Sequence, residues 1–362
     1  MKRRQFLKNT VIAGAVASFP APAVARETRD LKMVTVWPRN LPGLAAGAER
    51  LAKRINDLSG GELNVKVFAA GELVPPQESF DAVASGFADM YHASEHYWRG
   101  KSRAYDFFSA VPFGMSATEM NAWLQFGGGQ PLWDELSASF NLKPFQAGNT
   151  GGRMGGWFNK EINAVSDFSR LKISMSDPGG EVLNRFGAKV SSLPPGEIVN
   201  SLRSGAIDAV EWFGPWNDMA LGLHQAAKYY YYPGFHKPGL ALSAAVNLIT
   251  WDKMPRGHQR LIETATAAEN AALSAEFTVR NAESLELMVK EHKVKLRRFP
   301  DSALEAFGDA SGRLVNEAAA GDKITMKIYK SFLDFRRKAI GWSRHSELAF
   351  GGARQLPFKY GE

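Results

Sequence analysis

Two kinds of hydrophobic pattern alternate along the first two thirds of the chain. Stretches that are valine-rich or alternate apolar with polar residues predict strands, whereas apolar residues three or four positions apart predict helices. The predicted strands are 31–37, 62–73, 89–94, 107–114, 170–176, 189–194 and 209–213. The predicted helices are 41–59, 75–86, 179–188 and 195–204. Because strand and helix alternate, the pattern predicts mostly parallel sheets with helices on both faces.

The last third of the chain has longer helical patterns. An alanine- and glutamate-rich helix is predicted at 256–291, a strand or connector at 296–300, and further helices at 302–320 and 323–343. We therefore expect an α/β fold of two lobes with long C-terminal helices. The expected parts are 26–150, mainly the first lobe, 151–250, mainly the second, and 251–362, a helical part that braces both. Since ligands gather at the carboxyl ends of strands in open α/β lobes, the site is expected in the cleft between the lobes.

Residues 1–25 have the features of an export signal. A basic start precedes a mildly apolar segment and an Ala23-Val24-Ala25 cleavage motif. The pair Arg3-Arg4, followed by Gln5-Phe6-Leu7-Lys8, matches a twin-arginine signal, and an ordinary secretory signal is the alternative. We expect export to the periplasm.

Composition removes several classes of function. Four of the seven net positive charges lie in the first 25 residues, so the remainder carries only +3 and gives little support for nucleic-acid binding. The chain has no cysteine, which excludes disulfides, thiolate catalysis and cysteine metal sites. We find no phosphate-binding loop, zinc-protease motif or serine-hydrolase motif. His92 and His96 have a spacing that suits a metal only on a helix, and the predicted strand at 89–94 argues against that.

Two polar residues stand out from their surroundings. Glu211 ends the apolar stretch 206–210 and precedes a Gly-Pro turn, which places a carboxylate near the expected cleft. Arg153 lies among glycines in 148–162, where the backbone can approach a ligand closely, and arginine suits bidentate pairing with a carboxylate. The alternatives are a helix-capping or salt-bridged glutamate, and an arginine that lies at the surface or is bound to an aspartate or glutamate. The aromatic residues near Glu211 either wall the site or belong to the core.

Several stretches together resemble one family. They are "WPRNLPGLAAGAERLA", "AAGELVPPQESFDAVASGFADMYHAS", "FFSAVPFG", "GNTGGRMGGWFNKEI", "LPPGEIVNSLRSGAIDAVEWFGPWND" and "KYYYYPGFHKPG". In order and spacing, over nearly the whole mature chain, they are similar to the DctP-type solute-binding subunit of TRAP transporters. The subgroup that it most resembles binds 2-oxo acids and related monocarboxylates.

The resemblance implies a periplasmic binding protein that captures a small organic carboxylate between two lobes. It implies delivery to TRAP membrane permease subunits, no catalysis and a possible homodimer through the C-terminal helices. A binding protein of an ATP-driven importer is the first competitor, and the order of the motifs argues against it. A secreted enzyme or a ligand sensor on the same fold remains the alternative.

The resemblance also implies site positions, and this chain departs from several of them. In the subgroup a glutamine stands where this chain has Arg153 and helps to hold a sodium or calcium ion bridging to the ligand carboxylate. The arginine that pairs with that carboxylate stands where this chain has Ser174, and an acid stands where it has Lys237. The family acid and tryptophan, which are metal positions, are present as Glu211 and Trp212.

We therefore expect a carboxylate site without a metal, in which Arg153 and Lys237 replace the ion and the missing arginine. Their two positive charges would balance Glu211 and one ligand carboxylate, since an unpaired buried ion costs several kcal/mol. Ser174 leaves room for a different solute: a hydroxy acid, an amino-acid derivative or a small dicarboxylate. Further residues near the family cleft are expected to line the pocket: Tyr91, Trp37, Asn149, Phe213 and Trp216.

Overall fold

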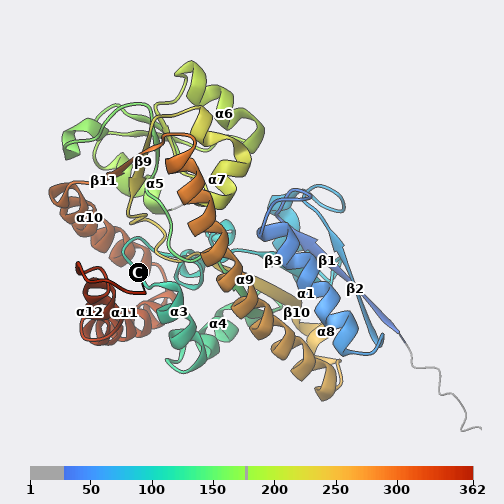
Figure 1. The fold of residues 1–362 in the computed structure, drawn as a ribbon. Coiled ribbons are helices and arrows are strands. Elements are labelled where there is room, and N and C mark those ends of the chain that lie inside the picture. The colour runs from blue at the N-terminus through green and yellow to red at the C-terminus, as the bar shows by residue number, and fades with distance from the viewer. Residues whose placement is uncertain (1–27, 176–177, 362) are drawn as a thin grey trace, which may run out of the picture.

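The computed structural model describes residues 28–175 and 178–361, and the predicted export signal at 1–25 lies outside them. A five-stranded sheet forms the first lobe (Figure 1). Its strands, in spatial order, are β2 (Leu63–Phe68), β1 (Arg29–Thr35), β3 (Met90–Ala93), β10 (Ala241–Asn247) and β4 (Leu142–Asn149). The first three are parallel, whereas β10 is antiparallel to both of its neighbours.

A six-stranded sheet forms the second lobe. Its strands are β11 (Lys295–Arg298), β9 (Tyr229–Tyr232), β5 (Gly156–Phe158), β8 (Ala209–Val210), β6 (Lys172–Ser174) and β7 (Lys189–Ser191). Strand β6 is parallel to β7 and β8, while β5 is antiparallel to β8 and β9. The two-lobed α/β fold expected from the pattern is confirmed.

Three connections cross between the sheets, and the two short ones matter for the site. Strand β4 belongs to the first sheet and β5 to the second, so residues 150–155 cross from one lobe to the other. Strand β9 belongs to the second sheet and β10 to the first, so residues 233–240 cross back. Part of the region expected mainly in the second lobe thus completes the first sheet.

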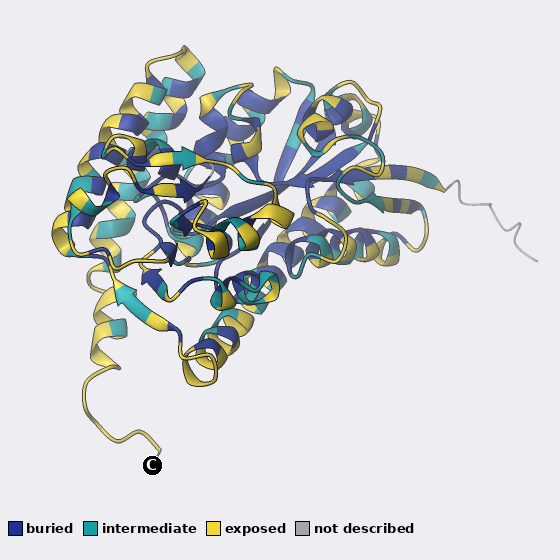
Figure 2. Ribbon diagram, turned by 90° about the horizontal axis from the view of Figure 1, so that it is seen from above, coloured by how far each residue is buried: buried dark blue, intermediate teal, exposed yellow. Residues whose placement is uncertain are grey.

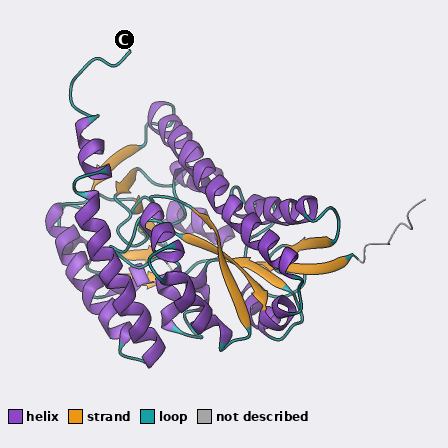
Figure 3. Cartoon of the chain, turned by 90° about the horizontal axis from the view of Figure 1, so that it is seen from below, coloured by secondary structure: helices purple, strands orange, loops and turns teal. Residues whose placement is uncertain are grey.

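Helices cover the sheets on both faces (Figure 3). Those that follow the strands of the first half are α1 (Leu44–Leu58), α2 (Ser79–Ala84), α3 (Ala117–Gln125) and α4 (Gly129–Ala138). Those after residue 175 are α5 (Pro178–Asn184), α6 (Pro195–Ser204), α7 (Pro215–Leu221) and α8 (Leu248–Asp252). Short 3-10 helices lie at Pro76–Glu78, Glu95–Trp98, Arg103–Phe108, Val165–Phe168 and Leu223–Gln225.

The long helix α9 (Arg256–Lys290) packs on both lobes. It contacts α1 and β4 of the first lobe and α7 of the second, and Figure 1 shows it running along both. Its buried Glu269 accepts hydrogen bonds from Arg50 of α1, with Nη2 to Oε1 at 2.7 Å. Helices α10 (Asp301–Ala319), α11 (Lys323–Ser343) and α12 (Glu347–Ala353) follow, so the predicted C-terminal helices are confirmed. None of the helices in the described ranges is long and apolar enough to cross a membrane.

The strand predicted at 107–114 is wrong. Residues 103–108 form a 3-10 helix whose start is capped by Ser102, because its hydroxyl accepts a hydrogen bond from the Ala104 N–H. Phe113 then has a φ of 52°, which ends any extended run. The apolar residues are nevertheless buried, since Phe108 stacks on a tryptophan in the first-lobe core. Figure 2 shows this buried interior running through both lobes.

Candidate functional site

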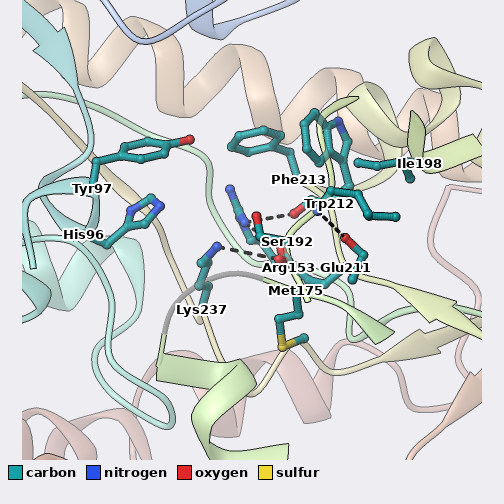
Figure 4. A pocket seen from close by; sticks show the side chains of 12 residues that line it. His96, Tyr97, Arg153, Met175, Ser192, Ile198, Glu211, Trp212, Phe213 and Lys237 are labelled. Atoms are coloured by element: carbon teal, nitrogen blue, oxygen red, sulfur yellow. Dashed lines mark hydrogen bonds and ion pairs between the residues drawn. The ribbon is translucent and has the colours of Figure 1, made fainter. Parts of the chain in front are cut away.

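Four polar residues of the predicted site meet at the junction between the lobes. Arg153 lies on the crossing from β4 to β5, and Lys237 lies on the crossing from β9 to β10. Ser174 ends β6, and Glu211 directly follows β8. All four line one cavity of about 50 Å³ (Figure 4). The ends of neighbouring strands therefore gather polar side chains, as expected of open α/β sheets.

The cavity opens into a larger cleft between the lobes. This cleft of about 670 Å³ has walls from 36–42 and 76–77 of the first lobe and from 192–195, 212–213, 217 and 220–221 of the second. Five residues line both spaces: Tyr97, Ser192, Leu193, Trp212 and Phe213. The small cavity is therefore the inner end of the interlobe cleft.

Arg153 is the centre of the polar network. Its Nη1 donates to Oε1 of Glu211 at 2.9 Å and to the backbone oxygen of Trp212 at 3.0 Å. The Nε donates to the Thr150 hydroxyl at 3.3 Å, and the guanidinium lies 4.6 Å from the centre of the Phe213 ring. The remaining nitrogen, Nη2, is buried and has no hydrogen-bond partner among the described residues. A buried donor of this kind calls for an acceptor from outside the described residues, which a bound ligand can supply.

Glu211 is surrounded by groups that favour its charged form. Lys237 Nζ lies 3.6 Å from Oε2, and Nε2 of His236 lies 3.2 Å from Oε1. Burial alone would raise the pKa of Glu211, but Lys237, His236 and Arg153 outweigh it and hold that pKa below its usual range. The carboxylate is thus ionised, and it fixes the cations around it.

Ser174 occupies the position where an arginine was expected from the family. Its side chain is buried, and its oxygen accepts the backbone N–H of Leu193 at 3.2 Å. The hydroxyl group holds the loop after β7 against the end of β6. Its small volume leaves the cavity open on this side.

The other predicted lining residues are placed less closely together. Phe213 and Trp212 line both spaces, and Trp37 lines the larger cleft. Tyr91, Asn149 and Trp216 lie outside both spaces. The Tyr91 hydroxyl donates to buried Glu95 in the first-lobe core, Asn149 accepts the backbone N–H of Gly151, and Trp216 packs on Phe277 of α9. These three side chains point into the packing around the cleft.

Several lining residues were missed by the sequence reasoning. On the first-lobe side these are His96 and Tyr97, which Figure 4 shows across the cavity from the Trp212 and Phe213 wall. On the second-lobe side they are Met175, Ser192, Leu193 and Ile198, with His236 beside Glu211. The signal for His96 was its position directly after the predicted strand 89–94, where a strand end meets the cleft.

Asp218 holds the loop that carries the aromatic wall. Its Oδ1 accepts the backbone N–H groups of Phe213 and Gly214 at 3.1 and 2.8 Å. Its Oδ2 accepts Trp157 Nε1–H at 2.9 Å and the Tyr230 hydroxyl at 2.7 Å. Burial raises the pKa of Asp218 to about 6 although these donors lower it, so the group is a carboxylate at neutral pH. The second residue of the tyrosine run thus supports the cleft wall from behind.

The two histidines considered as a metal pair have other roles. His92 lies on β3 and accepts a hydrogen bond from Trp37 Nε1 at 2.8 Å. His96 lies on the following 3-10 helix and bonds to two serines. Within 28–175 and 178–361, no group of three or more histidine and carboxylate side chains is arranged to hold a metal ion.

Comparison with known proteins gives a consistent picture. Residues 33–322 match the family model of the bacterial extracellular solute-binding protein, family 7 (DctP). A monocarboxylate 2-oxoacid-binding periplasmic protein of Nostoc sp. is 38% identical over 359 residues, which cover 97% of this chain and 98% of that protein.

Solved structures agree with this assignment. A TRAP periplasmic solute-binding protein of Colwellia psychrerythraea with bound calcium and pyruvate is 34% identical, with a TM-score of 0.86 over 90% of this chain and 100% of that one. One of Pseudoalteromonas atlantica with sodium and pyruvate is 34% identical, with a TM-score of 0.85 over 92% and 100%. One of Bordetella bronchiseptica, a dimer with calcium and picolinate, is 32% identical, with a TM-score of 0.86 over 91% and 97%. The chain belongs to the DctP family of extracytoplasmic solute-binding proteins of TRAP transporters.

Proposed function

We propose that this protein captures a small organic monocarboxylate at the inner end of the interlobe cleft and delivers it to TRAP membrane permease subunits. The observation that carries the proposal is Nη2 of Arg153, a buried donor without a partner among the described residues in a cavity of about 50 Å³. A ligand carboxylate supplies the missing acceptor and forms a charge-assisted hydrogen bond. The related proteins with bound pyruvate support a carboxylate as the solute. No turnover of the solute is expected.

We further propose that the carboxylate binds without a metal ion. At the two metal positions implied by the family, Glu211 and the Trp212 carbonyl, the oxygen atoms both accept hydrogen bonds from Nη1 of Arg153. Lys237 adds a second positive charge 3.6 Å from Glu211. A sodium or calcium ion placed among these groups would be repelled by two fixed cations and would compete for oxygens already in use. These residues do not fit a metal ion, and the guanidinium takes its place.

Removing metal ions is expected to leave solute binding unchanged. Mature protein is titrated calorimetrically with pyruvate and other short monocarboxylates in chelator, and then with added sodium or calcium. The affinity should be the same within error in all three conditions, because the cation is part of the chain. Affinity that is lost in chelator and returns with calcium contradicts the metal-free site, whereas absence of binding to every carboxylate contradicts the proposed function.

We propose that the protein is exported by a twin-arginine signal within residues 1–25.

We also propose that two copies of the protein associate through the C-terminal helices. Large apolar side chains are exposed at the end of α11 and beyond it: Trp342, Leu348, Phe350, Leu356, Phe358 and Tyr360. Exposed apolar surface is a feature of protein–protein interfaces. The relative from Bordetella bronchiseptica, a dimer, supports a second copy as its partner. Light scattering on the mature protein should give twice the chain mass, and a monomer at all concentrations would contradict the dimer.

A further inference from the structure

A chain of hydrogen bonds behind the cavity fixes which nitrogen of His96 carries the proton. Ser94 Oγ lies 2.7 Å from the backbone oxygen of Ala241. A carbonyl oxygen can only accept, so the single hydroxyl proton of Ser94 is used there. The hydroxyls of Ser94 and Ser109 lie 2.8 Å apart, and one of them must donate. Because Ser94 has no proton left, Ser109 donates to Ser94.

Both serine oxygens are therefore acceptors towards His96. Nδ1 of His96 lies 3.2 Å from Ser94 Oγ and 3.1 Å from Ser109 Oγ. Since neither hydroxyl has a proton to give, Nδ1 must carry one and donate it. Ser94, His96 and Ser109 are all buried, so this network lies in the protein interior.

The other ring nitrogen faces the cavity as an acceptor. Burial lowers the pKa of His96 well below its usual value, and Lys237 and Arg153 lower it further, so the ring is neutral. With the proton on Nδ1, Nε2 has a free lone pair. None of the described residues makes a hydrogen bond to Nε2, and His96 lines the cavity that contains Arg153. Figure 4 shows the ring on the first-lobe side of this space.

We infer that His96 is a specificity-determining residue that selects a solute with a hydrogen-bond donor beside its carboxylate, namely a 2-hydroxy monocarboxylate over the 2-oxo acid of the same skeleton. The inference rests on the proposed function, because Arg153 must hold the carboxylate. A hydroxyl group can accept from a cation of the site and donate to Nε2. A ketone oxygen can only accept, so it would face Nε2 with two lone pairs opposed and leave that nitrogen unsatisfied.

An amino acid is a weaker fit to the same acceptor. Its ammonium group could donate to Nε2, but it would enter a space already flanked by Arg153 and Lys237. Among the described residues, Glu211 pairs with both of these cations. Placing the ammonium group close to the positive charges of Arg153 and Lys237 in a buried cavity would cost binding energy. The neutral hydroxyl avoids that repulsion.

The test compares matched solutes by calorimetry on the mature protein. Lactate is paired with pyruvate, and 2-hydroxy-4-methylpentanoate with 2-oxo-4-methylpentanoate. The hydroxy acid is expected to bind at least about tenfold more tightly in one or both pairs. An oxo acid that binds equally or more tightly in both pairs overturns the inference and leaves the carboxylate receptor intact. Failure to bind any of the four overturns the proposed function and the inference with it.

Two variants separate the acceptor from simple packing. His96→Leu removes the acceptor, so the preference for the hydroxy acid should disappear, whereas the control His292→Leu, at an exposed position, should keep it. Ser94→Ala touches no cavity-lining atom but frees the Ser109 proton for Nδ1, which moves the ring proton to Nε2. The preference should then fall or reverse. An unchanged preference in Ser94→Ala or in His96→Leu overturns the role of His96.

A spectroscopic readout works even if a variant fails to fold. Long-range ¹⁵N–¹H spectra of wild-type protein with labelled histidine distinguish a protonated from an unprotonated ring nitrogen. For His96 we expect protonated Nδ1 and unprotonated Nε2, with the opposite pattern in Ser94→Ala. Protonated Nε2 in the wild type overturns the inference directly.

Discussion

Arg153→Gln is expected to weaken metal-free binding of a monocarboxylate by roughly 1.5–3 kcal/mol, the scale of a hydrogen bond to a charged group. This corresponds to roughly a 10- to 150-fold loss of affinity. The reason is that Nη2 of Arg153 is the buried donor aimed at the solute, and glutamine supplies no charge. The same variant also frees Glu211 Oε1 and the Trp212 carbonyl and adds an amide oxygen beside them. We therefore expect calcium to restore binding in the variant.

Calorimetric titration in chelator and with added calcium measures both effects. Arg297→Gln is the matched control, because Arg297 is a half-exposed partner of Glu161 on the second lobe and should leave affinity unchanged. Full metal-free affinity in Arg153→Gln would show that the guanidinium does not bind the solute. Reduced affinity that calcium fails to restore would retain Arg153 as the solute donor but reject the idea that it stands in for a metal ion.

Glu211→Gln is expected to lower the free energy of unfolding by about 3 kcal/mol at neutral pH, the low end for breaking a buried ion pair. The low end applies because a glutamine oxygen still accepts the N–H of Arg153. The side chains of Arg153 and Glu211 are only 1% and 4% exposed, so water cannot compensate for the lost charge. Folding lowers the pKa of Glu211 from its ordinary value of 4.5. The ionised side chain therefore contributes fully to the free energy of unfolding above about pH 4.5, and this contribution is lost as the pH falls towards the lower pKa of the folded state.

Urea denaturation at pH 7 and pH 3.5 checks this expectation. The difference between wild type and Glu211→Gln should be larger at pH 7 than at pH 3.5, because at pH 3.5 the carboxyl group of the unfolded wild-type chain takes up a proton that the folded chain excludes. Glu283→Gln, at an exposed ion pair on α9, serves as the control and should change stability little at either pH. A difference that does not depend on pH would mean that Glu211 acts through packing and not through its charge.

The sequence predicted the long C-terminal helices and the charged residues of the site. The helix predicted at 256–291 is α9, and those at 302–320 and 323–343 are α10 and α11. These are long periodic segments, for which local pattern decides the structure. Arg153 and Glu211 are 58 positions apart in the chain and nevertheless pair directly. Strand-end position and family resemblance placed them in one site without any knowledge of the contact.

What the sequence did not reveal depends on tertiary packing. The segment 107–114 has the composition of a strand, but a serine cap and a positive φ at Phe113 turn it into a 3-10 helix and a loop. Tyr91 was expected to line the cleft, but its hydroxyl donates a hydrogen bond to the buried Glu95 and its side chain points into the core. His96 was considered only for a metal, because the direction of its hydrogen bonds depends on Ser109 and on the Ala241 carbonyl, which are distant in the chain.

The two short connections between the sheets carry the positively charged residues of the site. Residues 150–155 carry Arg153 and residues 233–240 carry Lys237, so each cation lies on a segment that joins the two lobes. Helix α9, about 52 Å long at 1.5 Å per residue, is fixed to both lobes and resists their sliding apart. A rotation of one lobe relative to the other would bend the chain next to the charged groups. An anion bound by Arg153 and Lys237 would therefore contact the connecting segments directly, so its binding would act on the same residues that such a rotation bends.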